Sequence, residues 1–129
     1  MLAVDTNVVV RYLTNDDPVQ AAIARKLVAG HSIHLPKTVV LESEWVLRSL
    51  YRFSPQRICA ALHAFALLSN VTVEDAEQVS RAFGWFEQGM DFADAMHLAS
   101  AADCDAFATF DRKLAAAARK AKAGKVKAL

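Results

Sequence analysis

Four acidic residues occupy positions from which they could act together on a phosphodiester: Asp5, Glu42, Asp94 and Asp111. Grouped carboxylates raise one another's pKa unless a cation is present, and carboxylates without His or Cys are typical of sites for hard ions such as Mg²⁺ or Mn²⁺. The sequence has no P-loop and no GxSxG elbow, the motifs that would indicate other chemistry. The acids therefore indicate metal-assisted hydrolysis of a phosphodiester.

Three of these acids also have a purely structural interpretation. Asp5 could form an Asx turn or cap the helix expected to start near Val8. Asp91 could be the N-cap of the helix expected at 91–102, with Asp94 at the third position of that helix. Asp111 could cap the helix that follows it. Taken singly, each acid leaves both interpretations open. Their joint placement at strand ends and first helical turns favours a shared site.

The two glutamates of the long central helix differ in their neighbours. Glu44 precedes Arg48 by four residues, a spacing that predicts a surface ion pair. Glu42 shares a helical stripe with Trp45, so it borders an apolar face and needs a partner, either a metal or a core hydrogen bond. His97 lies three residues after an aspartate, but a His on a helix of this kind is more often satisfied by its neighbours, and we do not expect it to be a ligand.

Short apolar segments alternate with amphipathic ones along the whole chain. Strands are expected at 1–5, 33–35, 71–73, 106–110 and 126–129. Helices are expected at 8–13, 19–29, 36–53, 55–68, 74–86, 91–102 and 112–121, with Gly30 ending the second and Thr38 as the N-cap of the third. This order predicts an α/β fold with a small, mostly parallel sheet flanked by helices. Ligands of such sheets bind beyond the carboxyl ends of the strands, where Asp5 and Asp111 lie.

Composition narrows the class of protein further. A length of 129 residues, 54% of them hydrophobic, fits a single domain over 1–129 and excludes intrinsic disorder. No apolar run is long enough for a membrane span and no secretory signal is visible, so we expect a cytoplasmic protein without a membrane partner. Cys59 and Cys104 are isolated in alanine-rich segments, and both are expected to be core thiols.

Charge is unevenly distributed although the formal net charge is only +1. Nine acids and one base lie between Glu74 and Asp111, whereas the rest of the chain after Asp111 holds seven Lys or Arg and no acid. The basic end has two interpretations, a solvated helix end or an edge that contacts nucleic-acid phosphates. In the second case the contacts are expected from Lys120, Lys122 and Lys125.

Four segments together resemble the PIN-domain ribonucleases, specifically the VapC toxins of bacterial toxin–antitoxin pairs: VDTN at 4–7, ExxWVL at 42–47, DFADAMHLA at 91–99 and TFD at 109–111. The resemblance covers nearly the whole chain. It implies a compact α/β/α sandwich, an acidic pocket that binds Mg²⁺ or Mn²⁺, and endonucleolytic cleavage of RNA.

The resemblance also assigns roles to individual residues. Asp5, Asp94 and Asp111 would contact the metal directly or through water, and Glu42 would bind a second ion or orient a water molecule. Asp91 is a possible additional acid of the site. The residues expected to contact these acids without contacting the ion are Thr6, Asn7 and Thr109.

The resemblance further implies partners. A VapC-like chain would form a homodimer and bind a VapB-like antitoxin, and the apolar side chains of helices 38–53 and 55–68 are the expected contact surfaces. Two other functions stay open at this point: a PIN-like module that binds nucleic acid or protein without turnover, and a metal-dependent nuclease that acts on DNA.

Overall fold

The computed structural model describes all residues, 1–129, as two compact units, Met1–Ala76 and Glu77–Leu129. The predicted α/β class is confirmed: seven helices alternate with five short strands, and every strand pairing is parallel. The strands are divided between two sheets, with the order β1-β2-β3 in the N-terminal unit and β4-β5 in the C-terminal unit. None of the helices combines the length and apolar character needed to cross a membrane.

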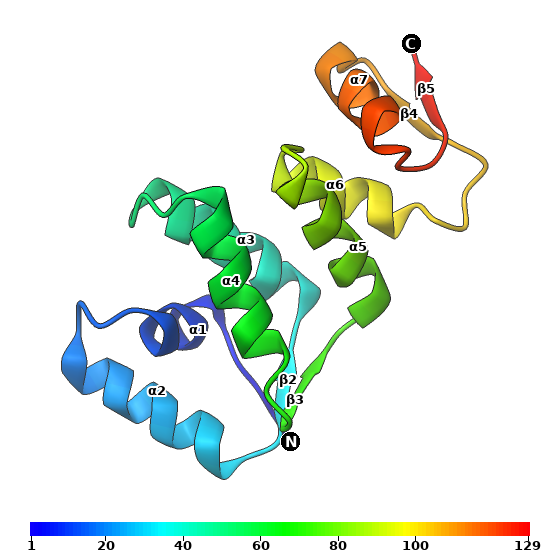
Figure 1. Ribbon diagram of the computed structural model, residues 1–129. Helices are drawn as coiled ribbons and strands as arrows, with labels where there is room; N and C mark the ends of the chain where they lie inside the picture. The colour runs from blue at the N-terminus through cyan, green and yellow to red at the C-terminus, as the bar shows by residue number, and fades with distance from the viewer. The chain divides into compact units, whose positions relative to one another are not determined.

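The N-terminal unit contains three strands and four helices, whose arrangement Figure 1 shows. Its elements are β1 (Leu2–Ala3), α1 (Thr6–Leu13), α2 (Pro18–Gly30), β2 (Ile33–Leu35), α3 (Lys37–Ser49), α4 (Pro55–Ala66) and β3 (Val71–Val73). Ile33 lies opposite both Leu2 and Val71, so β2 is the central strand. Figure 1 shows β1 leading into α1 and β2 leading into α3. The helices that position Asp5 and Glu42 therefore begin at the carboxyl ends of these two strands.

Helix packing fixes α1 within this unit. Val9 and Val10 on α1 are buried, as is Leu47 on α3. On α2 the buried residues are Ala21, Ala24 and Val28, and the two alanines allow close approach to α1. Because α1 is held on several sides, the residues at its first turn have a defined position.

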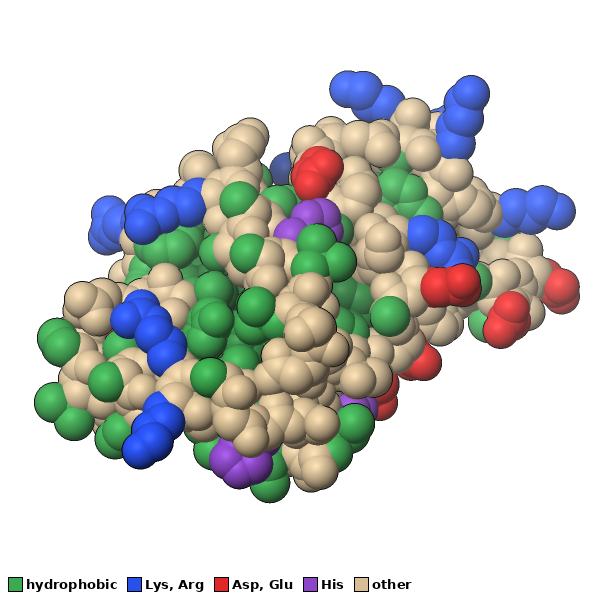
Figure 2. All heavy atoms as spheres, turned by 60° about the horizontal axis from the view of Figure 1, so that its bottom comes forward, with side chains coloured by type: hydrophobic (Ala, Val, Ile, Leu, Met, Phe, Trp, Pro, Cys, Tyr) green, Lys and Arg blue, Asp and Glu red, His purple; other side chains and the backbone are tan.

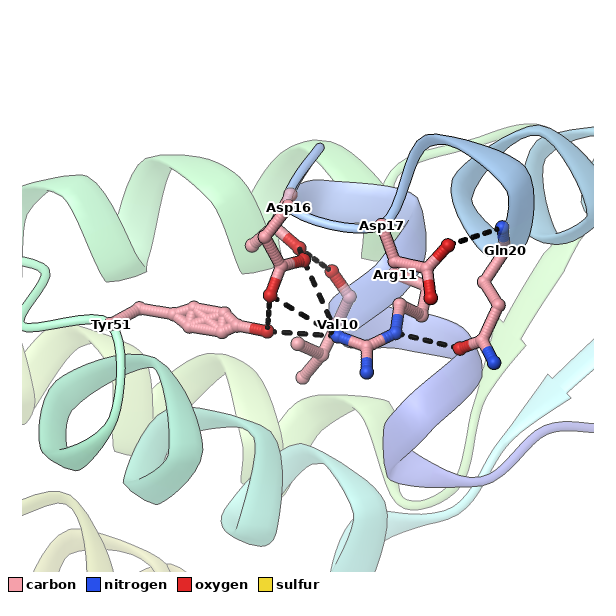
Figure 3. A network of polar contacts seen from close by, with 7 residues as sticks. Val10, Arg11, Asp16, Asp17, Gln20 and Tyr51 are labelled. Atoms are coloured by element: carbon pink, nitrogen blue, oxygen red, sulfur yellow. Dashed lines mark hydrogen bonds and ion pairs between the residues drawn. The ribbon is translucent and has the colours of Figure 1, made fainter.

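A network of polar contacts ties the far end of α1 to its surroundings (Figure 3). Arg11 donates to Gln20 at 2.8 Å, to Tyr51 at 2.9 Å and to Asp16 at 3.3 Å. The Tyr51 hydroxyl donates to Asp16 at 2.7 Å, and this bond, helped by Thr14 and the Arg11 charge, lowers the Asp16 pKa below its ordinary value against the opposing effect of burial. The ionised carboxylate therefore joins α1, the start of α2 and the segment after α3.

The start of α3 differs from the prediction. The helix begins at Lys37 rather than after an N-cap at Thr38, and its N-cap, Pro36, offers no side-chain hydrogen bond. The carboxylate of Glu74, which follows β3, accepts the backbone N–H of Lys37 at 2.8 Å, and Asp75 pairs with the Lys37 ammonium at 3.0 Å. A distant part of the chain thus supplies the cap that the local sequence lacks.

Other element ends differ from the predicted ranges: α1 begins at Thr6, earlier than the start predicted near Val8, and α2 includes Gly30, while several elements are shorter than predicted. The first strand forms only at Leu2–Ala3, and α3 ends at Ser49 instead of residue 53 because Arg52 takes a left-handed backbone conformation with φ of +58°. The predicted helix 74–86 begins only at Ala76, since Asp75 has φ of +48°. Positive φ is incompatible with a right-handed helix, which explains both changes.

The C-terminal unit holds three helices and the second sheet. Its elements are α5 (Ala76–Glu87), which begins at the boundary, α6 (Phe92–Ser100), β4 (Phe107–Thr109), α7 (Arg112–Ala121) and β5 (Val126–Ala128). Phe92 packs against Phe83 and Phe86, each with ring centroids 5.2 Å apart. These aromatic contacts join the start of α6 to α5.

Burial corrects two predictions and confirms a third. Cys59 is buried as expected, but Cys104 is exposed because α6 ends at Ser100 and leaves Cys104 in a turn. Glu44 does pair with Arg48, at 2.8 Å, but its side chain is 2% exposed, so this is not a surface ion pair. The Arg48 side chain, by contrast, is half exposed and covers the glutamate from the solvent side.

Candidate active site

The acids of the N-terminal unit lie at the first turn of α1 and on the exposed face of α3. Asp5 is the N-cap of α1, and its Oδ1 accepts the Val8 N–H at 3.1 Å. The next residue, Thr6, is buried, and its hydroxyl donates to Oε1 of Glu42. The predicted need of Glu42 for a polar partner is therefore met by a hydroxyl from another helix. This contact orients Glu42 next to the end of β1.

The acids of the C-terminal unit lie at the starts of α6 and α7. Asp91 is the N-cap of α6, and its Oδ2 accepts the N–H of Asp94, the third residue of the helix, at 3.1 Å. Asp111 is the N-cap of α7, and its Oδ1 accepts the N–H groups of Lys113 and Leu114 at 2.9 and 3.0 Å. Each of these two caps stabilises the first turn of its helix.

The Thr109 side chain holds the backbone of Asp111 in place. Its Oγ1 accepts the Asp111 backbone N–H at 2.9 Å, which closes a tight turn between β4 and α7. Thr6 and Thr109 each contact one of these acids or its backbone. Asn7 differs: it is exposed, makes no side-chain hydrogen bond within the chain, and lines a hollow between α1 and α2.

The capping role of an aspartate leaves room for a second role. At Asp5, Asp91 and Asp111 the cap uses a single carboxylate oxygen. The other oxygen of each accepts no hydrogen bond within the protein, and neither oxygen of Asp94 does. Asp5, Asp91 and Asp111 are therefore helix caps, and each cap leaves one carboxylate oxygen without a partner in the protein.

The electrostatics of Asp94 set it apart from the other acids. Burial raises the pKa of its carboxyl group above the ordinary value, and the negative charges of Asp91 and Asp111 raise it further, while His97 acts in the opposite direction. Asp94 is therefore close enough to Asp91 and to Asp111 for their charges to repel its own. A cation placed beside Asp94 would reverse this repulsion.

Carboxylate oxygens are the donors that Mg²⁺ and Mn²⁺ prefer, so the donor set fits either ion. The structure contains no group of three Asp, Glu, His or Cys side chains that could hold one ion. The cations expected to contact phosphates, Lys120, Lys122 and Lys125, are all exposed, at the end of α7 and just beyond it.

The sequence matches the PIN domain family over residues 2–120, so the chain belongs to that family and to the nuclease class it defines. No curated protein matches the chain. Among solved structures, the chain is similar to VapC20 of Mycobacterium tuberculosis, a sarcin–ricin loop cleaving toxin. The two chains are 21% identical with a TM-score of 0.46, and the match covers 91% of this chain and 95% of the other.

Proposed function

We propose that this protein is a Mg²⁺- or Mn²⁺-dependent endoribonuclease that acts as a VapC-type toxin. The proposal rests on PIN family membership together with one feature of the site, the aspartates that cap helices with one oxygen and keep the other free. Charge repulsion around Asp94 supports it, because a site that is unfavourable without a cation is one that a cation stabilises.

In this proposal the chain forms a single PIN domain over 1–129, and Asp5, Asp94 and Asp111 hold the ion. When bound, such an ion would lower the pKa of a nearby water and would place positive charge beside the phosphate. Glu42, oriented by the Thr6 hydroxyl, accepts a proton from the attacking water or positions it. In-line attack by water leaves a 5′-phosphate and a 3′-hydroxyl and does not use the 2′-hydroxyl of RNA.

A cleavage assay on a labelled single-stranded RNA tests this function. We expect cleavage with Mn²⁺ or Mg²⁺, no cleavage with EDTA, and no cleavage by Asp5→Asn or Asp94→Asn, both of which keep the side-chain shape. Binding of RNA without metal-dependent cleavage would favour the non-catalytic module. Cleavage of a DNA copy at the same rate would favour a nuclease that acts on DNA.

Two protein partners belong to the same proposal, a second copy of the chain and a VapB-like antitoxin, both in the cytoplasm. Apolar side chains gather on the left of Figure 2, the side on which Figure 1 shows α1 and α2. On α3 and just after it, Trp45 and Leu50 are 52% and 69% exposed. Ile23, 64% exposed, lines the hollow of about 310 Å³ between α1 and α2. Large apolar side chains that are exposed to this extent support a surface that binds other proteins.

Toxicity and solution mass test these partners. Expressed alone, the protein should arrest growth of its host and elute as a dimer, and co-expression of its antitoxin should relieve the arrest. A harmless monomer that no neighbouring gene product inhibits would contradict the toxin assignment while leaving the nuclease assignment open to its own test.

A further inference from the structure

A second concave site lies within the C-terminal unit, between the end of α5 and the face of α7. It is a hollow of about 390 Å³, a size typical of small-ligand sites. Trp85, Gln88 and Met90 line one side, and Ala117 and Lys120 line the other. None of these residues belongs to the acidic site, and the nuclease assignment gives them no role apart from Lys120.

The backbone on the α5 side of the hollow has a defined geometry. Met90 donates its N–H to the carbonyl of Trp85 at 3.1 Å, Gly89 donates to Phe86 at 3.0 Å, and Gly89 has φ of +101°. These are the two hydrogen bonds and the left-handed residue of a Schellman motif, which ends α5. The motif fixes the positions of Trp85 and Gln88 before any ligand arrives. A preformed site loses less conformational entropy on binding.

Three chemically different groups face this hollow without a partner in the protein. The half-buried indole of Trp85 offers a flat aromatic surface, the exposed amide of Gln88 can both donate and accept, and the exposed ammonium of Lys120 carries a positive charge. Neither Gln88 nor Lys120 has a side-chain hydrogen bond or ion pair within the chain. An aromatic face, an amide and a cation around one hollow match the base, the base edge and the phosphate of a nucleotide.

We propose that this hollow binds one unpaired nucleotide of the RNA substrate, with its base stacked on Trp85, its edge hydrogen-bonded to Gln88 and its phosphate paired with Lys120. The inference rests on the proposed ribonuclease function and adds a subsite to it. The charge around the hollow favours RNA over an acidic or apolar peptide: Arg112, Lys113 and Arg119, the other cations of α7, are exposed and unpaired. A strand leaving the hollow along α7 would therefore meet further cations.

Tryptophan fluorescence tests the contact directly, because the chain has only two tryptophans. In EDTA, which prevents cleavage, a single-stranded RNA oligonucleotide should quench the Trp45→Phe variant, whose remaining indole is Trp85. The matched Trp85→Phe variant, which keeps only Trp45, should show no quenching. Trp85→Leu should weaken RNA binding about tenfold or more.

A second variant guards against a folding defect at Trp85. Lys120→Gln alters an exposed side chain, and it should reduce the slope of log affinity against log salt by about 0.7 for single-stranded RNA. Equal quenching of both single-tryptophan variants, or none in either, would overturn the nucleotide subsite even if the wild type cleaves RNA. Quenching of Trp85 by purified antitoxin instead of RNA would overturn it in favour of a protein site.

The two proposals fail in different ways. Absence of metal-dependent cleavage in the wild type would contradict the ribonuclease function, whatever the fluorescence shows. Cleavage by the wild type together with unchanged RNA affinity in Trp85→Leu would contradict only the subsite.

Discussion

Asp111 combines two roles that matched substitutions can separate. Its Oδ1 accepts two backbone N–H groups at the start of α7, at 2.9 and 3.0 Å, so Asp111→Ala leaves both donors without their partner. Loss of an N-cap side chain costs about 0.5–2 kcal/mol, and loss of both bonds at once places the expected cost in the upper half of that range. Asn caps helices as well as Asp does, so Asp111→Asn should keep the cap and lose only the charge.

The charge itself has two opposing effects on stability. A negative charge at a helix N-terminus contributes about 0.3–1 kcal/mol, but the charge of Asp111 also helps to raise the pKa of Asp94, which is a repulsion. We therefore expect Asp111→Asn to be close to the wild type in stability. Asp111→Ala should melt several degrees lower, at about 3–6 °C for each kcal/mol in a chain of this length.

Thermal melts followed by circular dichroism in EDTA, combined with RNA cleavage in Mn²⁺, check both roles. Asp111→Ala should be inactive and less stable, whereas Asp111→Asn should be inactive and normally stable. If the two variants melt at the same temperature, the cap contributes nothing in solution. If Asp111→Asn cleaves RNA at the wild-type rate, the carboxylate is not part of the active site.

Three further predictions concern the acids and the basic end. Asp94 has a raised pKa, so its ionisation destabilises the folded chain. Metal-free Asp94→Asn should therefore melt higher than the wild type at pH 7, and this difference should disappear below about pH 3, where the aspartate is protonated in both the folded and the unfolded state. A lower melting temperature for Asp94→Asn than for the wild type at pH 7 would contradict the repulsion. Thr6→Val removes the hydroxyl that orients Glu42 and should lower kcat about tenfold or more, while Thr6→Ser should retain activity. Equal activity in both variants would show that the hydroxyl is dispensable. Replacing Lys120, Lys122 and Lys125 with Gln should reduce the salt slope of RNA binding by about 2 with unchanged affinity for Mn²⁺, and an unchanged slope would return these lysines to the solvated-surface interpretation.

Local signals explain which elements the sequence predicts well. Asp17 before Pro18 and Ser54 before Pro55 form N-caps with side-chain bonds to residues three positions on, and both helices begin where the sequence indicates. The start of α3 was predicted wrongly because its capping group, Glu74, lies 37 residues further along the chain. No local pattern encodes such a contact.

The residues of the candidate site show the same difference between contacts within a few residues and contacts with distant parts of the chain. Asp91 and Asp111 cap their helices as the spacing predicts, since caps depend on neighbours within three residues. The partner of Glu42 could not be predicted from its helix, because the Thr6 hydroxyl comes from another element. The exposure of Cys104 was also missed, since an alanine-rich segment does not mark where its helix ends.

The central claim is that Asp5 and Asp94 each contribute to the binding of one divalent ion. Calorimetric titration of Mn²⁺ into the wild type, Asp5→Asn and Asp94→Asn tests it most directly. We expect one strong site in the wild type and at least about tenfold weaker binding in each variant. Wild-type affinity in Asp5→Asn together with loss of binding in Asp94→Asn would contradict the claim, because the ion would then be held without the acid that follows β1.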